Sequence, residues 1–113
     1  MAYSELLAER IRNLLSRKKI VCTEKKMFGG ICFLLNDKML AGIVDEKLMA
    51  RIDPGVYTDA LEKPGCHEMD FSGKPMKGFV YVYPKGIITD NLLLEWLELC
   101  LDYNPKAKSS KKK

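Results

Sequence analysis

Apolar residues recur along this chain with two different spacings, and the change of spacing separates predicted helices from predicted strands. Over residues 4–18 they follow the helical period of 3.6 residues, so that they gather on one face. Ser4 stands at the start of this segment, where its hydroxyl can accept from an otherwise unpaired backbone N–H. The pattern predicts an amphipathic helix whose inward positions are Leu6, Leu7, Ile11, Leu14 and Leu15.

From residue 20 to residue 52 the apolar residues come in short runs separated by glycines or polar pairs. Runs of this length, bounded by turn residues, are typical of antiparallel strands. The stretch from Met27 to Val44 is the centre of this pattern. Gly29-Gly30 predicts a bulge or a place where another backbone approaches closely. Asn36-Asp37-Lys38 predicts a hairpin turn, because Asn and Asp tolerate left-handed backbone angles. The four predicted strands cover residues 20–28, 31–35, 39–44 and 47–52.

The second half of the chain continues this mixture of elements. Asp53-Pro54 predicts the start of a short helix, because Asp caps a helix and Pro is tolerated at its first position. Residues 66–78 are polar and rich in Gly and Pro, so we predict a loop there, with a short strand around 67–71 as the alternative. Residues 79–83 are all β-branched or aromatic and predict a strand, and residues 90–103 predict the last helix.

These elements predict an α+β fold in two layers. An antiparallel meander of about five to six strands would carry the N-terminal and C-terminal helices on it. We expect one domain over residues 1–104, since a chain of 113 residues is of single-domain size. The lysine-rich tail over 105–113 cannot bury apolar surface and is predicted to be disordered.

The last helix is apolar over most of its circumference, and its polar residues form one narrow stripe. Such a helix must bury more than one side. In a domain this small the second side would meet another copy of the chain, so we expect a homodimer. The residues predicted to contribute to this interaction surface are Leu94, Trp96 and Leu101, with Lys74 and Lys77 from the 66–78 segment.

The formal net charge of +4 belongs to the tail. Without the five lysines of the last eight residues, 14 basic residues face 15 acidic ones. A nearly neutral body argues against a broad nucleic-acid footprint on the folded domain. The tail itself can contact phosphates without sequence preference. The predicted nucleic-acid contacts are therefore Lys106, Lys108, Lys111, Lys112 and Lys113.

Compartment and redox state follow from what the chain lacks. No run approaches the ~18 apolar residues of a membrane-spanning helix, and the first residues do not resemble a secretory signal, so we expect a cytoplasmic protein. The four cysteines form no C-x-x-C pair. In a reducing compartment they are expected to be free and to pack as small apolar residues.

No catalytic or cofactor motif is complete. Gly73-Lys74 is followed by Pro75 rather than by Ser or Thr and a helix, so it does not make a phosphate-binding loop. Cys66-His67 is the one pair that resembles a nucleophile and its base, but neighbours on an extended segment point to opposite faces. His67 is also the sole histidine, which removes most metal sites. We expect no enzyme activity, no cofactor and no metal.

One pattern leaves an alternative open. Phe79, Tyr81 and Tyr83 alternate on one face of a strand, and Lys74, Lys77 and Lys85 lie nearby in sequence. Aromatic residues interleaved with basic ones are typical of single-strand nucleic-acid binding. The same alternation also suits a core strand, because Val80 and Val82 fill its other face.

Two motifs in this order resemble the amino-terminal domain of the TfoX/Sxy family, over roughly residues 5–103. The first motif lies in the strand pair at the centre of the chain, and the second spans residues 69–82. The residues that carry the resemblance are Met27, Phe28, Gly29, Gly30, Phe33, Lys38, Met39, Gly42, Leu48, Arg51, Met69, Asp70, Phe71, Ser72, Gly73, Lys74, Pro75, Met76, Lys77, Gly78, Phe79, Val80, Tyr81 and Val82.

The resemblance implies a two-layer α+β fold and a link to bacterial regulators of competence genes, which are thought to act as coactivators with a DNA-bound transcription factor. It implies no catalytic residues. The chain is similar to a stand-alone first domain, without the family's C-terminal helical domain. Our leading hypothesis is a noncatalytic regulatory domain that acts by protein–protein contact as a homodimer. The alternatives are nonspecific nucleic-acid binding through the tail and the 66–78 segment, and a small-ligand binder or enzyme.

Overall fold

The computed structural model describes residues 3–27, 30–71 and 74–106, and it contains one antiparallel sheet of six strands in the order β1-β2-β3-β4-β6-β5. The first four strands follow one another as a meander, and β6 then pairs with β4 and leaves β5 at the edge. The strands are β1 (Thr23–Met27), β2 (Gly30–Leu35), β3 (Lys38–Val44), β4 (Lys47–Arg51), β5 (Cys66–Phe71) and β6 (Lys74–Val82).

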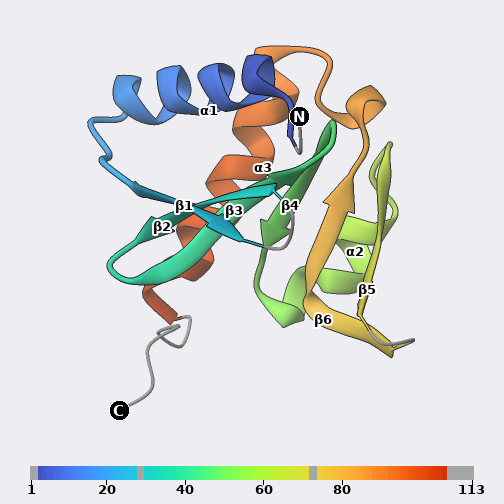
Figure 1. Ribbon diagram of the computed structural model, residues 1–113. Helices are drawn as coiled ribbons and strands as arrows, with labels where there is room; N and C mark the ends of the chain where they lie inside the picture. Colours follow the sequence, from blue (N-terminus) through green and yellow to red (C-terminus); the bar gives the residue numbers. More distant parts are fainter. Residues whose placement is uncertain (1–2, 28–29, 72–73, 107–113) are drawn as a thin grey trace.

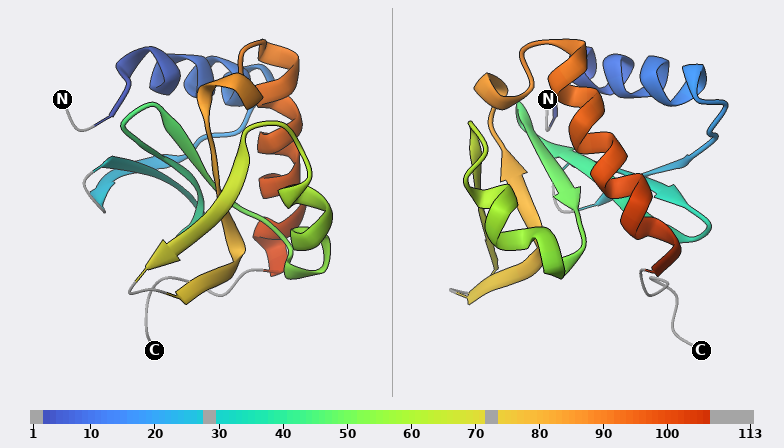
Figure 2. Two further views of the ribbon diagram at one scale, coloured as in Figure 1. Left: turned by 90° about the vertical axis from the view of Figure 1, so that its right-hand side faces the viewer. Right: turned by 180° about the vertical axis from the view of Figure 1, so that it is seen from behind.

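Three helices complete the second layer: α1 (Glu5–Arg17), α2 (Tyr57–Leu61) and α3 (Asp90–Tyr103). In Figure 1, α3 lies behind the sheet, and the view from behind in Figure 2 shows α3 and α2 in front of it. The predicted α+β fold, with an N-terminal and a C-terminal helix on an antiparallel sheet, is therefore confirmed. None of the described helices is long and apolar enough to cross a membrane.

The main core fills the space between the helices and one face of the sheet. Val80 and Val82 of β6 are fully buried there, as are Ile11 of α1 and Leu97 of α3. Ser4 caps α1 as predicted, because its hydroxyl accepts from the backbone N–H of Leu7 at 3.2 Å. Burial of a complete Leu or Ile side chain contributes about 1.5–3 kcal/mol, so this face supplies most of the fold's stability.

One inward position of α1 was predicted incorrectly. Leu6 is 74% exposed, whereas Leu7, Ile11, Leu14 and Leu15 are buried. Leu14 and Leu15 are adjacent and both buried, so the exposure of Leu6 does not follow from the helical period alone but from its place at the start of α1, beside the segment that links β6 to α3. The sequence pattern placed both on a broad apolar stripe, and the structure leaves Leu6 outside it.

The central hairpin confirms the turn prediction. Asn36 and Asp37 have φ angles of 56° and 64°, the left-handed values of a two-residue hairpin turn. Lys38, which we had placed in the turn, is the first residue of β3. The pairing of β2 with β3 shifts between Phe33 and Leu34, which marks a β-bulge.

The short strand predicted as the alternative around residues 67–71 is confirmed as β5, and residues 74–78 belong to β6 rather than to the predicted loop. Strands β5 and β6 pair from Cys66↔Val82 to Phe71↔Lys74, with a register shift between Glu68 and Asp70. The loop prediction failed because β5 is an edge strand with one face open to solvent, so its polar side chains resemble those of a loop.

The segment after α3 is held against the sheet as far as the structure describes it. Asn104–Lys106 form a 3-10 turn, and the Asn104 side chain donates to the Leu35 carbonyl at 3.3 Å. Lys38 Nζ donates to the carbonyls of Asn104 and Pro105, each at 3.3 Å. The predicted domain boundary at residue 104 therefore falls inside this turn, and residues 107–113 lie outside the described chain.

Candidate functional site

The sheet has a second face that no helix covers, and we call it the open sheet face. Figure 1 looks onto this face, and Figure 2 shows the β1–β2 and β5–β6 hairpins bending to the side away from α3. Strand pairing places side chains opposite one another on it, as in the row Lys25, Cys32, Gly42, Met49, Tyr81 and His67.

The centre of the open sheet face is a small second core. Cys32 and Met49 are fully buried, and Phe79 and Tyr81 pack against this cluster. Gly42 is required between them, because a Cβ atom there would lie 2.6 Å from Met49 Cε and 2.9 Å from the Ile31 carbonyl oxygen. This explains why a glycine interrupts the apolar pattern of β3.

An aromatic and basic cluster lies beside this second core. Lys47 Nζ is 5.2 Å from the ring centre of Tyr81 and 5.5 Å from that of Tyr83. His67 makes an edge-to-face contact with Tyr83, with ring centres 4.6 Å apart. The Arg51 guanidinium lies 5.4 Å from the Phe79 ring centre. These distances are those of cation–π pairs.

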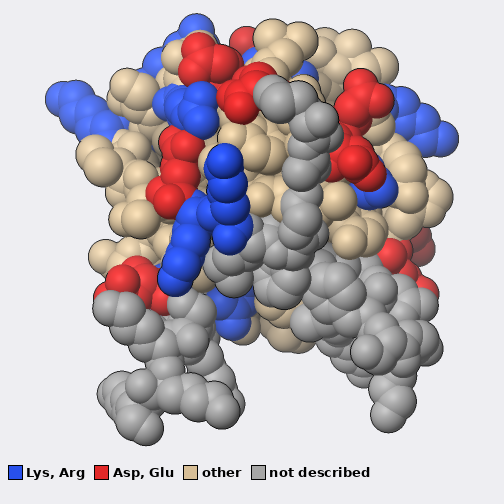
Figure 3. All heavy atoms as spheres, in the orientation of Figure 1, with Lys and Arg blue, Asp and Glu red and all other residues tan. Residues whose placement is uncertain are grey.

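Figure 3 shows the open sheet face with its side chains. Lys and Arg side chains stand near the middle of this view, with Asp and Glu side chains beside and above them. The described body of the chain is close to neutral overall, and Lys47 lies beside the aromatic rings of this face.

A second candidate surface is a groove between the start of α1 and the segment that links β6 to α3. Its volume is about 230 Å³. Leu6 and Ile88 on its rim are 74% and 70% exposed, values that are unusual for large apolar side chains. We call it the α1–linker groove, and it is lined by Ser4, Leu6, Leu7, Arg10, Glu46, Pro84, Ile87 and Ile88.

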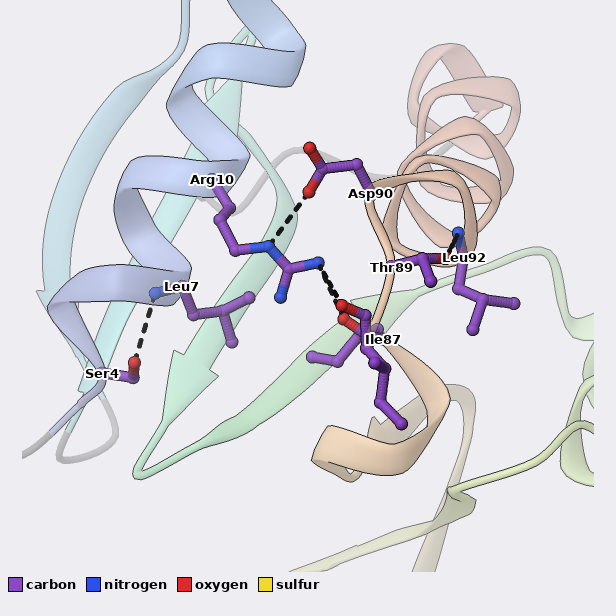
Figure 4. Close-up of polar contacts among 8 residues, drawn as sticks. Ser4, Leu7, Arg10, Ile87, Thr89, Asp90 and Leu92 are labelled. Carbon is purple, nitrogen blue, oxygen red and sulfur yellow. Dashed lines mark hydrogen bonds and ion pairs between the residues drawn. The ribbon is translucent and has the colours of Figure 1, made fainter.

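Arg10 fixes the geometry of this groove. Figure 4 shows its side chain reaching from α1 toward the linker and the start of α3. Its Nη2 donates to the Ile87 carbonyl at 2.8 Å, and its Nε lies 3.2 Å from Asp90 Oδ1. Thr89 caps α3 by accepting from the backbone N–H of Leu92 at 3.1 Å. The linker that carries Ile88 is thus held at both ends.

The α3 residues predicted to form an interaction surface are buried or half-buried within the chain. Trp96 is 3% exposed and belongs to the main core, where Lys63 Nζ lies 5.9 Å from its ring centre. Leu94 and Leu101 are half-buried and pack against the same core. The broad apolar circumference of α3 is therefore largely used within the chain, because both β-sheet and neighbouring helices surround it.

The Cys66–His67 pair is not arranged for catalysis. Cys66 is buried opposite Val82 on the helix side, whereas His67 lies opposite Tyr81 on the open sheet face. Burial also raises the pKa of the Cys66 thiol to about 11, which keeps it protonated at neutral pH. All four cysteines are free, and no cluster of three metal-ligating side chains exists among the described residues.

The motif residues serve the fold where the structure describes them. Gly30 allows close approach of β3, since a Cβ atom there would clash with the Ile43 carbonyl oxygen, and Gly78 has a φ of 90°. Lys38 binds the end of α3, and Met39 is buried in the second core. Phe28, Gly29, Ser72 and Gly73 lie outside the described residues. For Met27, Met69, Asp70, Phe71, Lys74, Pro75, Met76 and Lys77, the described backbone lies in β1, β5 or β6.

Among the five tail lysines, Lys106 alone falls within the described residues. It is exposed, and its Nζ lies 3.9 Å from Asp53 Oδ2. Lys108, Lys111, Lys112 and Lys113 lie outside, so their nucleic-acid contacts remain a prediction.

The fold is that of a two-layer α+β domain with one open sheet face. The chain belongs to the TfoX N-terminal domain family, whose sequence profile matches residues 15–103. This family is of a regulatory type. A search of curated proteins found no match, and a search of solved structures found none either.

Proposed function

We propose that this chain is a noncatalytic regulatory domain that acts by protein–protein contact and forms a homodimer through the α1–linker groove. The observation that supports the proposal is the pair of exposed apolar side chains, Leu6 and Ile88, on the rim of one groove. Exposed apolar groups that gather in one place are typical of interaction sites, whereas isolated ones need no explanation.

The groove has the parts that a two-fold contact requires. In a symmetric dimer the same patch meets itself, so it needs both protruding and receiving features. Leu6 and Ile88 protrude, while Leu7 and Ile87 lie deeper and are buried. Glu46 also lines this groove, whereas the Arg10 guanidinium is already bound to Asp90 and to the Ile87 carbonyl. The protruding and receiving apolar side chains support a second copy of the chain as the occupant of the groove.

The family supports a regulatory role, and the proposal places this role in the cytoplasm. The resemblance to TfoX/Sxy domains implies a coactivator of competence-type genes, with a DNA-bound transcription factor as a further partner. In this proposal the dimer presents two copies of the domain to such a partner. Contact with a protein, rather than turnover of a substrate, is consistent with the absence of a nucleophile and base pair among the described residues.

The dimer proposal is tested by single charge substitutions on the rim. We expect Leu6→Glu to convert a dimer into a monomer in light scattering, because the two new carboxylates would be buried against each other. The matched control is Val21→Glu, since Val21 is 88% exposed but lies away from this groove, at the other end of α1. A dimer that survives Leu6→Glu, or one that dissociates equally with Val21→Glu, would overturn the proposal.

A further inference from the structure

We propose that the open sheet face binds single-stranded nucleic acid, with bases stacked on Tyr83, His67 and Tyr81 and phosphates held by Lys25 and Lys47. This function is separate from the proposed dimer contact, because the α1–linker groove lies at the start of α1 and beside the β6–α3 linker. It also differs from binding through the lysine tail.

The first argument is the sign of the charge. Lys25 lies opposite Cys32 in the β1–β2 pair, and Lys47 lies two residues before Met49 on β4, so both lysines share the open sheet face. The Arg51 guanidinium at the end of β4 lies near the rings of both Phe79 and Tyr103 of α3, so it is not counted among the phosphate ligands. Among strand residues whose side chains the structure describes, no Asp or Glu shares that face. Glu24 of β1 instead turns to the helix side, where Arg12 of α1 binds its carboxylate at 2.7 and 2.8 Å.

One acidic residue borders this surface. Asp45, in the turn between β3 and β4, has its Oδ2 3.7 Å from Lys47 Nζ. This distance is long for an ion pair, and the Asp45 side chain is 70% exposed, so the pair is weak in water. The Lys47 side chain keeps 22% of its surface exposed, and through this part a phosphate with a full negative charge can compete with Asp45.

The second argument is the accessibility of the rings. Tyr83 is 40% exposed and His67 is exposed, and their edge-to-face contact leaves ring surface available to a ligand. Tyr81 is half-buried and continues the same surface toward the second core. Stacking on such rings tolerates any base, because every base has a π-face.

The third argument concerns whether the nucleic acid is single-stranded or a duplex. In a duplex the bases are already stacked on each other and cannot reach rings that lie on a sheet, whereas unpaired bases can. The described helices of this domain are on the opposite side of the sheet, so none of them can enter a duplex groove from the open sheet face. The aromatic and basic face therefore favours single strands.

The experiment measures binding of fluorescein-labelled oligo(dT), oligo(U) and a duplex of equal length by fluorescence anisotropy, at several salt concentrations. We expect binding to the single strands that weakens with salt, and weaker binding to the duplex. Comparison of oligo(dT) with oligo(U) distinguishes DNA from RNA as the ligand. No binding of either single strand at low salt, or stronger binding of the duplex, would overturn the proposal.

Two matched pairs of variants locate the site. Tyr83→Ala should weaken binding about tenfold, and Tyr83→Phe should leave it nearly unchanged because the ring remains. The slope of the logarithm of the binding constant against the logarithm of the salt concentration should become shallower by about one in Lys25→Ala. It should not change in Lys26→Ala, because Lys26 is on the other face of the same strand. Equal effects of Lys25→Ala and Lys26→Ala, or no effect of Tyr83→Ala, would contradict a site on this face.

A chain that lacks residues 107–113 separates the sheet from the tail. We expect this shortened chain to keep its dependence on Tyr83. If removal of these residues abolishes all binding, the tail is the site and the proposal fails. The failure of this proposal would not affect the dimer, whose oligomeric state is measured without nucleic acid.

Discussion

Arg10 on α1 donates a hydrogen bond of 2.8 Å to the carbonyl oxygen of Ile87, 77 residues further along the chain. This contact joins the first helix to the linker before the last helix, and it positions Ile88 on the rim of the α1–linker groove. The arginine side chain is 25% exposed, so the bond is partly shielded from water. One residue thus contributes both to the packing of the helices and to the shape of the proposed contact surface.

We predict that Arg10→Ala lowers the free energy of unfolding by about 1–3 kcal/mol, because it removes a charged donor from a partly buried carbonyl. The measurement is urea unfolding followed by circular dichroism. Asp90→Asn is the control, and it should cost less than about 1 kcal/mol because Asp90 is largely exposed. A larger loss for Asp90→Asn than for Arg10→Ala would show that the ion pair, rather than the carbonyl bond, is the important contact.

Gly30→Ala tests the reason for the glycine at the start of β2. A Cβ atom there would overlap the backbone of Ile43, which cannot move without breaking the β2–β3 pairing. We predict a loss of about 3 kcal/mol or more in the free energy of unfolding, or failure to fold. Thermal unfolding measures it, and Gly55→Ala is the control.

The control should be nearly neutral, because the nearest atom to a Cβ at Gly55 is the flexible Asp53 side chain, at 3.3 Å. If Gly30→Ala folds with the stability of the parent chain, the close approach of β2 and β3 in the structure is incorrect.

Alkaline pH should destabilise the fold through its buried thiols. Burial raises the pKa of Cys32 and Cys66 to about 11 and that of Cys100 to about 12. Above about pH 8.5 the unfolded chain loses these protons first, so stability falls as the pH rises toward the folded pKa values. Urea unfolding at a series of pH values from 7 to 11 measures the effect.

The Cys32→Ala variant provides the check on this interpretation. The alkaline loss of stability should become smaller in this variant relative to its own stability at neutral pH. If Cys32→Ala, Cys66→Ala and Cys100→Ala all lose as much stability at alkaline pH as the parent chain, titration of tyrosine or lysine causes the loss.

Acidic pH should weaken the contact between α1 and β1. Arg12 lowers the pKa of Glu24 by a two-pronged hydrogen bond to its carboxylate. The stabilisation is present above the ordinary pKa of a glutamate and is lost as the pH falls through the lowered value. Because both side chains are about one-third exposed, we expect Glu24→Gln to cost at most about 1 kcal/mol at pH 7.

The difference between Glu24→Gln and the parent chain should vanish at low pH in urea unfolding. Glu62→Gln is a suitable control, since Glu62 is exposed at the end of α2. A difference that persists unchanged at low pH would contradict the ion pair.

Local sequence rules predicted most of the fold. Ser4 and Thr89 cap their helices, Asn36 and Asp37 form the hairpin turn, and alternation along β4 gave the correct faces. These features depend on residues close in sequence, which is why they could be read without the structure. Strand β5 was predicted only as an alternative to a loop, and the first residues of β6 were predicted as loop, because the polarity of an exposed edge strand resembles that of a loop.

The candidate surfaces were harder to predict because they depend on contacts between distant segments. Nothing in the local pattern separates Leu6 from Leu7, and the exposure of Leu6 follows from where α1 meets the linker. Trp96 was expected on a surface, but Lys63 and the main core enclose it. The alternation of Tyr81 and Tyr83 was visible in the sequence, whereas the absence of a helix over their face was not.

The central claim is that the α1–linker groove joins two copies of this chain. Sedimentation equilibrium of the parent chain and of Ile88→Glu, from micromolar to near-millimolar concentration, tests it most directly. We predict a dimer for the parent chain and a folded monomer for Ile88→Glu, with circular dichroism confirming that the variant is folded. A parent chain that remains monomeric over the whole range, or an Ile88→Glu variant that dimerises as strongly as the parent, would contradict the claim.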